Sequence, residues 1–370
     1  MQLLSKEEQK VMKITGIRTA TIEIPLRTPF KTALRTAYNV NDVLVCIDTD
    51  TEAKGYGEAP PTAVITGDTI PSIRDAIENY IAPALIGLNI DDLEDIEEII
   101  DKSMIHNTSA KAAVDMAVYD LFAKSCGKPL YQILGGARRE LETDLTVSVN
   151  PVDVMVRDAL NAVSRGFHIL KIKVGKGGRA DVERLKEVRR AVGKDIVIRA
   201  DANQGWTAKD AIHYIRMMEE EGVDLELVEQ PVPAWDLEGM QLVTSQVHTP
   251  VLADESMFSA SDALKILQMH AADLLNIKLM KTGGIHQALK ICTLAELYGV
   301  QCMVGCMLSS IISVSAAAHL AAGKKVVTKI DLDGPSLCRT DPYTGGPVYD
   351  GPGIIMNDTP GLGITQVPGF

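Results

Sequence analysis

Two lysines, Lys171 and Lys173, stand at alternate positions of a short apolar run. Side chains at alternate positions of a strand point to the same side, so both ammonium groups would face one way. A charged stretch of helical length follows, and a second apolar run leads into Asp201. The order strand, helix, strand predicts two parallel strands joined by a crossover helix. We therefore expect an ammonium and a carboxylate at the same edge of a sheet, an arrangement typical of a functional site.

Later runs of strand length also end on polar or ionisable residues. These residues are Asn203, Glu229, Asp254, Glu255, Lys278, Asp331 and Asp333. Asp201, Glu229 and Asp254 follow three consecutive strands, so we expect their carboxylates to converge, with Asn203 and Glu255 beside them. Three carboxylates that close cannot all stay ionised without a cation, and oxygen ligands select a hard ion. The sequence predicts Mg²⁺, with Mn²⁺ able to substitute; strand-end ion pairs with lysine or arginine are the alternative.

Lys173 and Lys278 belong to the second and sixth of eight predicted strands, hence to opposite walls of a closed sheet. Two lysines on opposite faces of one carbon can remove a proton from one side and return it on the other, which is racemisation or epimerisation. A metal ion there would bind substrate oxygens and stabilise an enediolate. Lys171 is expected to lower the pKa of Lys173 by like-charge repulsion. The alternative for Lys171 is a lysine that only reaches solvent.

Eight strand-like runs position these residues, and a helix-sized gap separates each run from the next. The runs cover residues 143–149, 169–174, 196–200, 225–229, 251–253, 274–279, 302–304 and 329–332. This repeat fits a closed β/α barrel better than the alternative, an open doubly wound sheet. Barrel enzymes place their chemistry at the carboxyl ends of the strands, where the ionisable residues lie.

The first part of the chain has an α+β pattern. Strands are expected at residues 14–24, 43–48 and 55–58, and helices at 73–81, 93–100 and 109–125. The segment 29–38 looks too basic and irregular for a hairpin tip. We predict a capping domain over residues 1–136, completed by the Gly- and Pro-rich tail 342–370, and a catalytic barrel over residues 137–341.

Composition limits the class of partner. The chain of 370 residues carries a net charge of −12, which disfavours nucleic acid and an anionic membrane surface. We see neither the residue order of a signal peptide nor an apolar run long enough to span a membrane. The six cysteines form no CxxC pair, so we predict free thiols in a cytoplasmic protein. We expect a small-molecule partner and assembly as a homo-oligomer.

Five short motifs lie at the predicted strand ends. They are Lys171-Ile-Lys173, Asp201-Ala-Asn-Gln-Gly-Trp206, Val-Glu229-Gln-Pro, Ala-Asp254-Glu-Ser and Asn-Ile-Lys278. Together they resemble the enolase superfamily, in its muconate-lactonizing subgroup, and within it the dipeptide epimerases. The resemblance implies that Asp201, Glu229 and Asp254 bind Mg²⁺ and that Lys173 and Lys278 are the acid/base pair. It also implies a modified TIM barrel, (β/α)7β, with an N-terminal α+β capping domain.

The same resemblance points to residues that bind a dipeptide. Asp331 and Asp333 match the DxD pair that receives the α-ammonium in this family, and a carboxylate pair is a cation site on physical grounds as well. The segment 29–36 is similar to the mobile loop of epimerases that act on Ala-Glu, in which an arginine at the position of Arg35 meets the glutamyl carboxylate. The family usually has a Glu where this chain has Ser309, which disfavours a cationic substrate side chain.

The expected substrate site is completed by Lys171, Met307, Leu308 and Ser309, with Met307 and Leu308 as apolar lining. The leading substrate is L-Ala-L/D-Glu, epimerised at the C-terminal residue. Hydrophobic dipeptides are one alternative, and an N-acylamino acid racemase or o-succinylbenzoate synthase is another. Asp331 and Asp333 argue against the latter two, whose substrates have no ammonium. Lys281-Thr-Gly-Gly hints at a phosphate loop but lacks the Walker spacing. A non-catalytic barrel would have no reason to keep both lysines and all three carboxylates.

Overall fold

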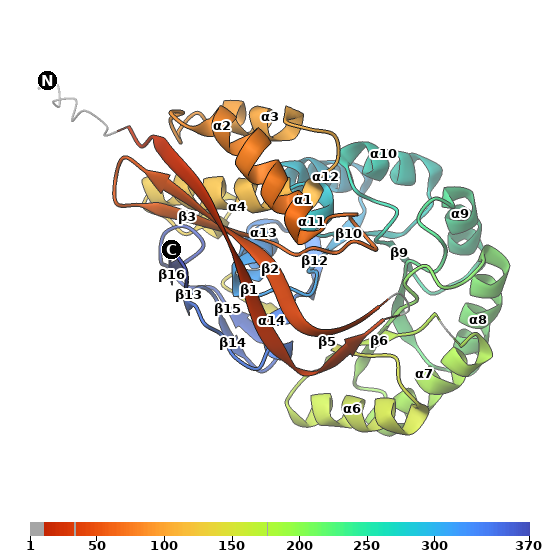
Figure 1. Cartoon of the computed structure of the whole chain (residues 1–370). Helices are drawn as coiled ribbons and strands as arrows, with labels where there is room; N and C mark the ends of the chain where they lie inside the picture. Colours follow the sequence, from red (N-terminus) through yellow and green to blue (C-terminus); the bar gives the residue numbers. More distant parts are fainter. Residues whose placement is uncertain (1–10, 33–34, 176) are drawn as a thin grey trace, which may run out of the picture.

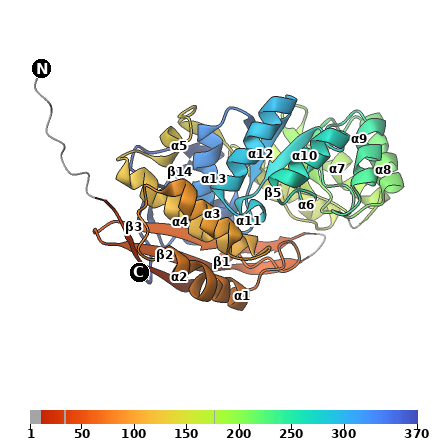
Figure 2. The same cartoon turned by 90° about the horizontal axis from the view of Figure 1, so that it is seen from above.

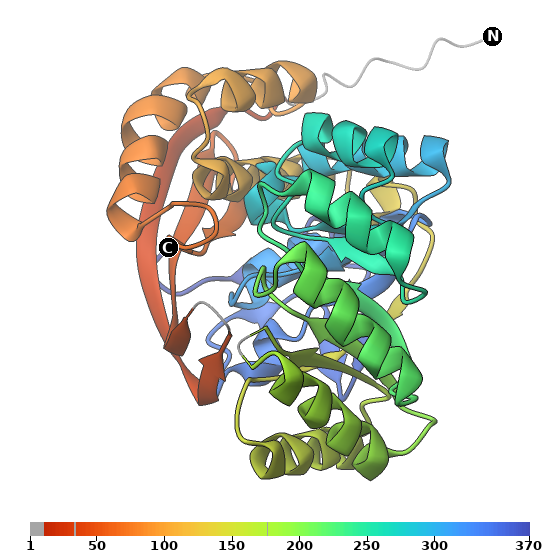
Figure 3. The ribbon, with the colours of Figure 1, turned by 90° about the vertical axis from the view of Figure 1, so that its right-hand side faces the viewer.

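A three-stranded antiparallel sheet begins the chain and forms one side of the molecule (Figures 1 and 3). The computed structural model describes residues 11–32, 35–175 and 177–370. The strands of this sheet are β1 (Ile14–Lys31), β2 (Thr36–Thr49) and β3 (Lys54–Ala59). Val43, Val45 and Ile47 of β2 pack toward the neighbouring helices, whereas Leu44 and Cys46 face the barrel core. Both faces of β2 are therefore buried, which explains its nearly continuous apolar run.

Helices cover one face of this sheet (Figure 1). They are α1 (Ile70–Asp75), the π-helical turn η1 (Ala76–Ile81), α2 (Ala82–Leu85), α3 (Leu93–Lys102) and α4 (Thr108–Ser125). The short α5 (Leu130–Ile133) follows and packs against the barrel helix α13 (Ile311–Gly323) instead. Thr69 begins α1 with a capping box, in which its side chain accepts from the Ser72 backbone and Ser72 caps in return. The three helices predicted in this part of the chain are confirmed. The first, predicted over residues 73–81, corresponds to α1 and η1 together and begins earlier, at Ile70.

The segment 29–38 is the tip of the β1–β2 hairpin, so the prediction that it is not one was wrong. Lys31 pairs with Thr36 in the antiparallel ladder. The ladder shifts register between Pro25 and Phe30, where β1 carries extra residues. Bulges accommodate prolines, which lack a backbone N–H, and they hide the alternation expected of a strand. Ala33 and Leu34, at the predicted loop's centre, lie outside the described residues.

Eight parallel strands form the barrel, in sequence order. They are β5 (Leu145–Val147), β6 (Ile169–Lys173), β7 (Val197–Asp201), β8 (Leu225–Glu229), β9 (Val251–Ala253), β10 (Leu274–Ile277), β11 (Gln301–Gly305) and β12 (Val327–Asp331). The helices around them (Figure 2) are α6 (Val152–Ser164), α7 (Arg179–Val192), α8 (Ala208–Glu220), α9 (Leu237–Gln246), α10 (Ala260–Met269), α11 (Leu279–Thr282), α12 (Ile285–Tyr298) and α13 (Ile311–Gly323). The predicted barrel is confirmed.

The barrel is nearly closed between its first and last strands. Among the described residues no ladder joins β5 to β12, but single hydrogen bonds cross the seam. Leu332 N donates to Thr143 Oγ1 at 2.8 Å, and Thr146 N donates to Asp333 Oδ2 at 2.7 Å. Arg199 of β7 donates to Asp144 Oδ2 at 2.8 Å, next to the start of β5. Side-chain hydrogen bonds thus help to close the barrel where no backbone ladder forms.

The C-terminal tail runs back along both parts of the molecule. Its elements are α14 (Gly334–Leu337), β13 (Thr344–Gly345), β14 (Val348–Asp350), β15 (Gly353–Ile355) and β16 (Ile364–Gln366). Strand β15 pairs with β4 (Glu140–Glu142), which lies at the junction between the two domains. Leu362 N donates to Asp120 of α4 at 2.8 Å, and the guanidinium of Arg18 in β1 lies 5.2 Å from the Phe370 ring centre. These contacts agree with a tail that completes the capping domain, whose exact bounds stay a prediction.

No helix among the described residues is long and apolar enough to cross a membrane. All six cysteines are described, and each is a free thiol, as predicted.

A buried histidine joins α13 to the capping domain and the tail. His319 is fully buried, and its Nδ1 accepts the backbone N–H of Tyr131 at 2.9 Å. Its other ring nitrogen interacts with the backbone carbonyl of Leu362. Burial lowers the pKa of His319 to about 4, so the neutral ring is the form that the fold selects.

This histidine should make stability depend on pH. The unfolded chain takes up a proton at His319 near pH 6.5, whereas the folded chain does so only near pH 4. The stabilisation is therefore present above pH 6.5 and is lost as the pH falls toward 4. His319→Asn keeps an acceptor but does not titrate. Urea unfolding at pH 7 and pH 4.5 should show the stability gap between the two proteins shrinking by about 2 kcal/mol in acid. A gap that stays constant would contradict the assignment.

Candidate active site

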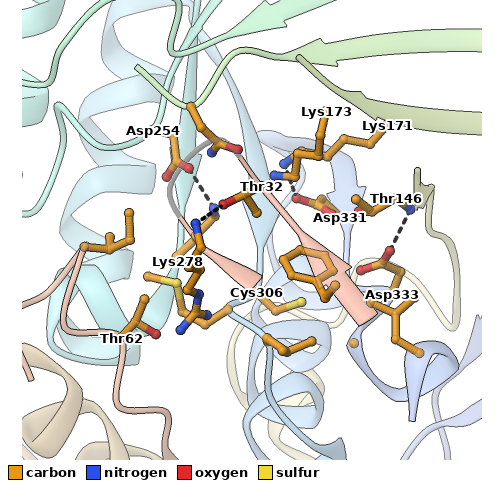
Figure 4. Close-up of a pocket in the computed structure, with 18 of the residues that line it drawn as sticks. Thr32, Thr62, Thr146, Lys171, Lys173, Asp254, Lys278, Cys306, Asp331 and Asp333 are labelled. Carbon is orange, nitrogen blue, oxygen red and sulfur yellow. Dashed lines mark hydrogen bonds and ion pairs between the residues drawn. The ribbon is translucent and has the colours of Figure 1, made fainter. Parts of the chain in front are cut away.

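A cavity of about 70 Å³ lies at the carboxyl ends of the barrel strands, facing the β1–β2 hairpin (Figure 4). Residues from the strand ends that line it are Lys171, Lys173, Asn203, Asp254, Glu255, Lys278, Asp331 and Asp333. The hairpin and loops contribute Phe30, Thr32, Arg35, Met307 and Leu308. Asp201, Glu229 and Ser309 are fully buried below this surface. The structure thus gathers the predicted site residues in one place, most of them on the cavity wall.

Lys171 occupies the centre of the site. Its Nζ lies 2.7 Å from Glu229 Oε2, 2.7 Å from Asp331 Oδ2 and 3.1 Å from Asp201 Oδ2. Burial opposes its charge, but the surrounding carboxylates raise the pKa of Lys171 well above its ordinary value. Lys171 is therefore a fixed internal cation, and the alternative of a solvent-reaching lysine does not hold.

Lys173 and Lys278 approach the cavity from opposite sides (Figure 4). Lys173 pairs in register with Asp201 on the next strand, and Asp201 pairs with Glu229 on the strand after it. Lys173 Nζ lies 2.5 Å from Asp201 Oδ2. Lys278 directly follows β10, and its Nζ lies 2.7 Å from Asp254 Oδ2. The opposed lysines predicted from strand numbering are thus present, each paired with a carboxylate.

The carboxylates point to lysines rather than to one common point. Among the described residues, no three histidine, cysteine or carboxylate side chains are arranged to hold a metal ion. Asp201 and Glu229 contact Lys171, whereas Asp254 is turned toward Lys278. The predicted convergence is therefore only partial, because ammonium groups neutralise these acids and draw them apart.

The donor set nevertheless fits a hard cation. Burial and the charge of Asp201 raise the pKa of Glu229 to about 7 even with Lys171 beside it. Burial also favours the protonated form of Asp201, but Lys173 and Lys171 hold its pKa below the ordinary value. Two more buried oxygens, Asn203 Oδ1 and Glu255 Oε2, have no hydrogen-bond partner in the described part of the chain. Such a set of crowded oxygens is the environment that Mg²⁺ prefers.

Asp331 and Asp333 also line the cavity, with Asp331 beside Lys171 (Figure 4). Burial opposes ionisation of Asp331, but Lys171 and Lys278 lower its pKa to about 2. Burial and the charge of Asp331 raise the pKa of Asp333 to about 6, although the Thr146 amide donates to it. A carboxylate pair held ionised near neutral pH can receive an ammonium group.

The pKa of Lys278 lies above its ordinary value. Burial does disfavour its ammonium form, but Asp254 and Glu229 outweigh burial and raise the pKa of Lys278. A cation bound to Asp254 would act in the opposite direction, because it would compete for the carboxylate that stabilises the ammonium.

Arg35 reaches the cavity from the hairpin. Burial lowers the pKa of this guanidinium, and the charge of Asp42 on β2 opposes the effect. Ser309, predicted to contact substrate, is instead buried, and its hydroxyl donates to the Met307 carbonyl at 3.2 Å. Met307 and Leu308 supply apolar lining, as expected.

Comparisons with known proteins agree with this geometry. Residues 14–135 match the family "Mandelate racemase / muconate lactonizing enzyme, N-terminal domain", and residues 154–367 match "Enolase C-terminal domain-like". The chain is 53% identical to an L-Ala-D/L-Glu epimerase of Clostridium acetobutylicum, over 96% of this chain and 99% of that one. The chain belongs to the enolase superfamily, with the dipeptide epimerases.

Two solved structures of this superfamily are similar over nearly their whole length. One is a substrate-liganded complex of the L-Ala-D/L-Glu epimerase from Bacillus subtilis, with a TM-score of 0.94 and 50% identity over 95% of this chain and 98% of that one. The other is the dipeptide epimerase of Enterococcus faecalis with Mg and L-Leu-L-Tyr, with a TM-score of 0.93 and 44% identity over 96% and 100%.

Three supporting residues were not assigned a role from the sequence. Asn276 Nδ2 donates to Glu229 Oε1 at 2.9 Å, and Gln230 Oε1 accepts the Asp254 amide at 2.9 Å. Lys281 is fully buried, with its Nζ 2.7 Å from Asp254 Oδ1 and donating to three backbone carbonyls, including that of Asp254. A usable signal was present for Asn276, since alternate strand positions place it on the same side as Lys278.

Removal of Lys281 should destabilise the fold strongly. Lys281→Met leaves Asp254 buried with one cation fewer, and breaking such a buried pair costs about 3–5 kcal/mol. Lys186→Met is the matched control, because Lys186 pairs with Glu221 while both side chains stay more than 40% exposed. That exposed pair should contribute far less to stability, because water and salt screen it. Equal unfolding free energies of the two variants in urea would disprove the role of Lys281.

Proposed function

We propose that this chain catalyses the Mg²⁺-dependent epimerisation of dipeptides at the α-carbon of the C-terminal residue. The observation that carries the proposal is the approach of Lys173 and Lys278 from opposite sides of one cavity (Figure 4). One lysine, as the neutral amine, takes the α-proton, and the other, as ammonium, delivers a proton to the opposite face. This two-base 1,1-proton transfer inverts the carbon.

Asp201, Glu229 and Asp254 would hold the metal, with Asn203 and Glu255 beside them. When bound, Mg²⁺ supplies positive charge next to the substrate carboxylate, where negative charge develops. Lys171 adds a second fixed cation, since its neighbours favour the charged form. The Enterococcus faecalis relative was solved with Mg and a dipeptide, which supports the same metal here.

Substrate binding requires the site to open. At about 70 Å³ the cavity is below the roughly 300–1,000 Å³ typical of ligand pockets. The lysine–carboxylate pairs fill much of it, and the β1–β2 hairpin covers it. A dipeptide therefore enters when the lysines turn to the substrate or the hairpin moves outward.

L-Ala-L/D-Glu is the leading substrate in this proposal. Asp331 and Asp333 would receive its α-ammonium, and Arg35 would meet the glutamyl carboxylate. Phe30, Met307 and Leu308 also line the cavity, so hydrophobic dipeptides are the second candidate, as in the relative named a hydrophobic dipeptide epimerase. The ammonium site disfavours N-acylamino acid and succinylbenzoate chemistry.

We further propose that the protein is a cytoplasmic homo-oligomer. The free thiols support the cytoplasmic location.

Deuterium exchange tests the reaction directly. In D₂O with Mg²⁺ and L-Ala-L-Glu, the protein should incorporate deuterium at the glutamyl α-carbon and form the L-Ala-D-Glu epimer, followed by NMR and mass spectrometry. Lys173→Ala and Lys278→Ala should each slow epimerisation by about 10³-fold or more, since each removes one acid/base group. One variant should still exchange the α-proton of a single epimer. If the unaltered protein exchanges the α-proton of no dipeptide, the proposal is wrong.

Arg35 should control the choice of side chain. Arg35→Met removes a charge-assisted hydrogen bond of about 1.5–3 kcal/mol, so KM for Ala-Glu should rise about 10- to 100-fold. KM for Ala-Leu, which offers no side-chain carboxylate, should change little. Steady-state kinetics with both dipeptides measures the ratio, and equal effects on the two substrates would remove Arg35 from specificity.

A further inference from the structure

A second cavity, of about 660 Å³, lies between strand β1 and helix α6. Figures 1 and 3 show the end of the hairpin close to α6, and the Val149 amide donates to the Lys31 carbonyl at 3.4 Å where the two parts meet. We call it the α6 cavity. It shares Phe30, Thr146 and Leu337 with the dipeptide cavity, so these residues form a common wall.

The α6 cavity is lined by cations. Arg27 and Lys31 come from β1, whereas Arg157 and Arg165 come from α6 and its end. Among the described residues of the lining, Asp158 is the one carboxylate. The local charge is therefore positive in a chain whose net charge is −12. A concave surface of one sign concentrates ions of the opposite sign.

Three of these cations are arginines without a polar partner among the described residues. In the described residues, the guanidinium groups of Arg27, Arg157 and Arg165 form no ion pair and no hydrogen bond, and Arg165 only stacks 5.3 Å from the Phe167 ring centre. Arg18 and Arg199, by contrast, each bond a carboxylate. Lys31 Nζ bonds the neutral Asn150 side chain at 3.2 Å. Four cations around one cavity are thus available to an anion.

We propose that a small anion with two negative charges, carried by phosphate or carboxylate groups, binds in the α6 cavity and holds the hairpin against the barrel. Without an anion, Arg27 and Lys31 on β1 repel Arg157 on α6 and Arg165 at its C-terminal end. A dianion between the two elements replaces this repulsion with charge-assisted hydrogen bonds, for which the planar arginine fork is well suited.

Anion binding should then affect dipeptide binding through the common wall. Phe30 directly precedes Lys31 and lines both cavities, and the Thr146 amide holds Asp333 at 2.7 Å. An anion that draws β1 inward also positions Phe30 and Arg35 over the dipeptide. Coupled sites typically alter each other's affinity by about fivefold or more. The dianion should therefore lower KM for the dipeptide rather than raise it.

Calorimetry with inorganic phosphate and with succinate, each against sodium chloride of equal ionic strength, tests binding without turnover. Saturable one-to-one binding of either probe is expected, and the comparison of the two shows which acid the site prefers. No saturable binding of either probe would overturn the proposal. Only the KM measurement rests on the proposed function, so failure of the activity leaves the binding test intact.

Two variants place the anion. Arg157→Gln/Arg165→Gln, changed together on the exposed face of α6, should abolish the calorimetric signal and the fivefold decrease in KM. Arg179→Gln is the matched control, because Arg179 is exposed at the start of α7 and does not line the cavity. It should keep both effects. Binding that persists in the double variant, binding lost equally in the control, or binding that leaves KM unchanged or raised would each contradict the proposal.

Discussion

The buried ammonium of Lys171 sets the electrostatics of the barrel interior. It contacts carboxylates from β7, β8 and β12, so one cation joins strands on different sides of the enclosure. Burying a charge is costly unless it is paired, and burying three acids together is costlier still. Their mutual neutralisation allows a polar layer to exist above the apolar layer of Leu227, Leu252, Leu274 and Met303. The placement of Lys173 and Lys278 depends on this balance.

In the proposed function, chemistry and substrate choice are carried by different parts of the molecule. The lysines proposed as acid/base groups and the carboxylates stand on or directly after barrel strands, where pairing with neighbours fixes their positions. Arg35 and Phe30 stand on a hairpin that reaches over from the other domain. Rigid strands suit proton transfer, which needs a constant geometry, whereas a hairpin can change sequence and position without disturbing it.

Much of the barrel and its chemistry could be predicted from the sequence, for a physical reason. Parallel strands end at one edge, so an ionisable residue after each apolar run is placed by topology alone. The hairpin tip was missed because a bulge with prolines breaks the strand period there. Lys281 was missed because its partners, Asp254, Met257 and Asn276, come from other strands and loops. No local sequence pattern indicates such contacts. The role proposed for Arg35 came from family resemblance, because periodicity could not indicate it.

The open seam between β5 and β12 has a consequence for how the chain folds. One of the hydrogen bonds that cross it joins residues 189 positions apart, Thr143 and Leu332. Every other strand neighbour in the barrel can pair as soon as the next βα unit is made, but this contact must wait for nearly the whole domain. Its loop-closure entropy is offset only after the intervening strands are in place. Enclosure of the barrel, and with it the docking of Asp333 on the Thr146 amide, should therefore be among the last events of folding.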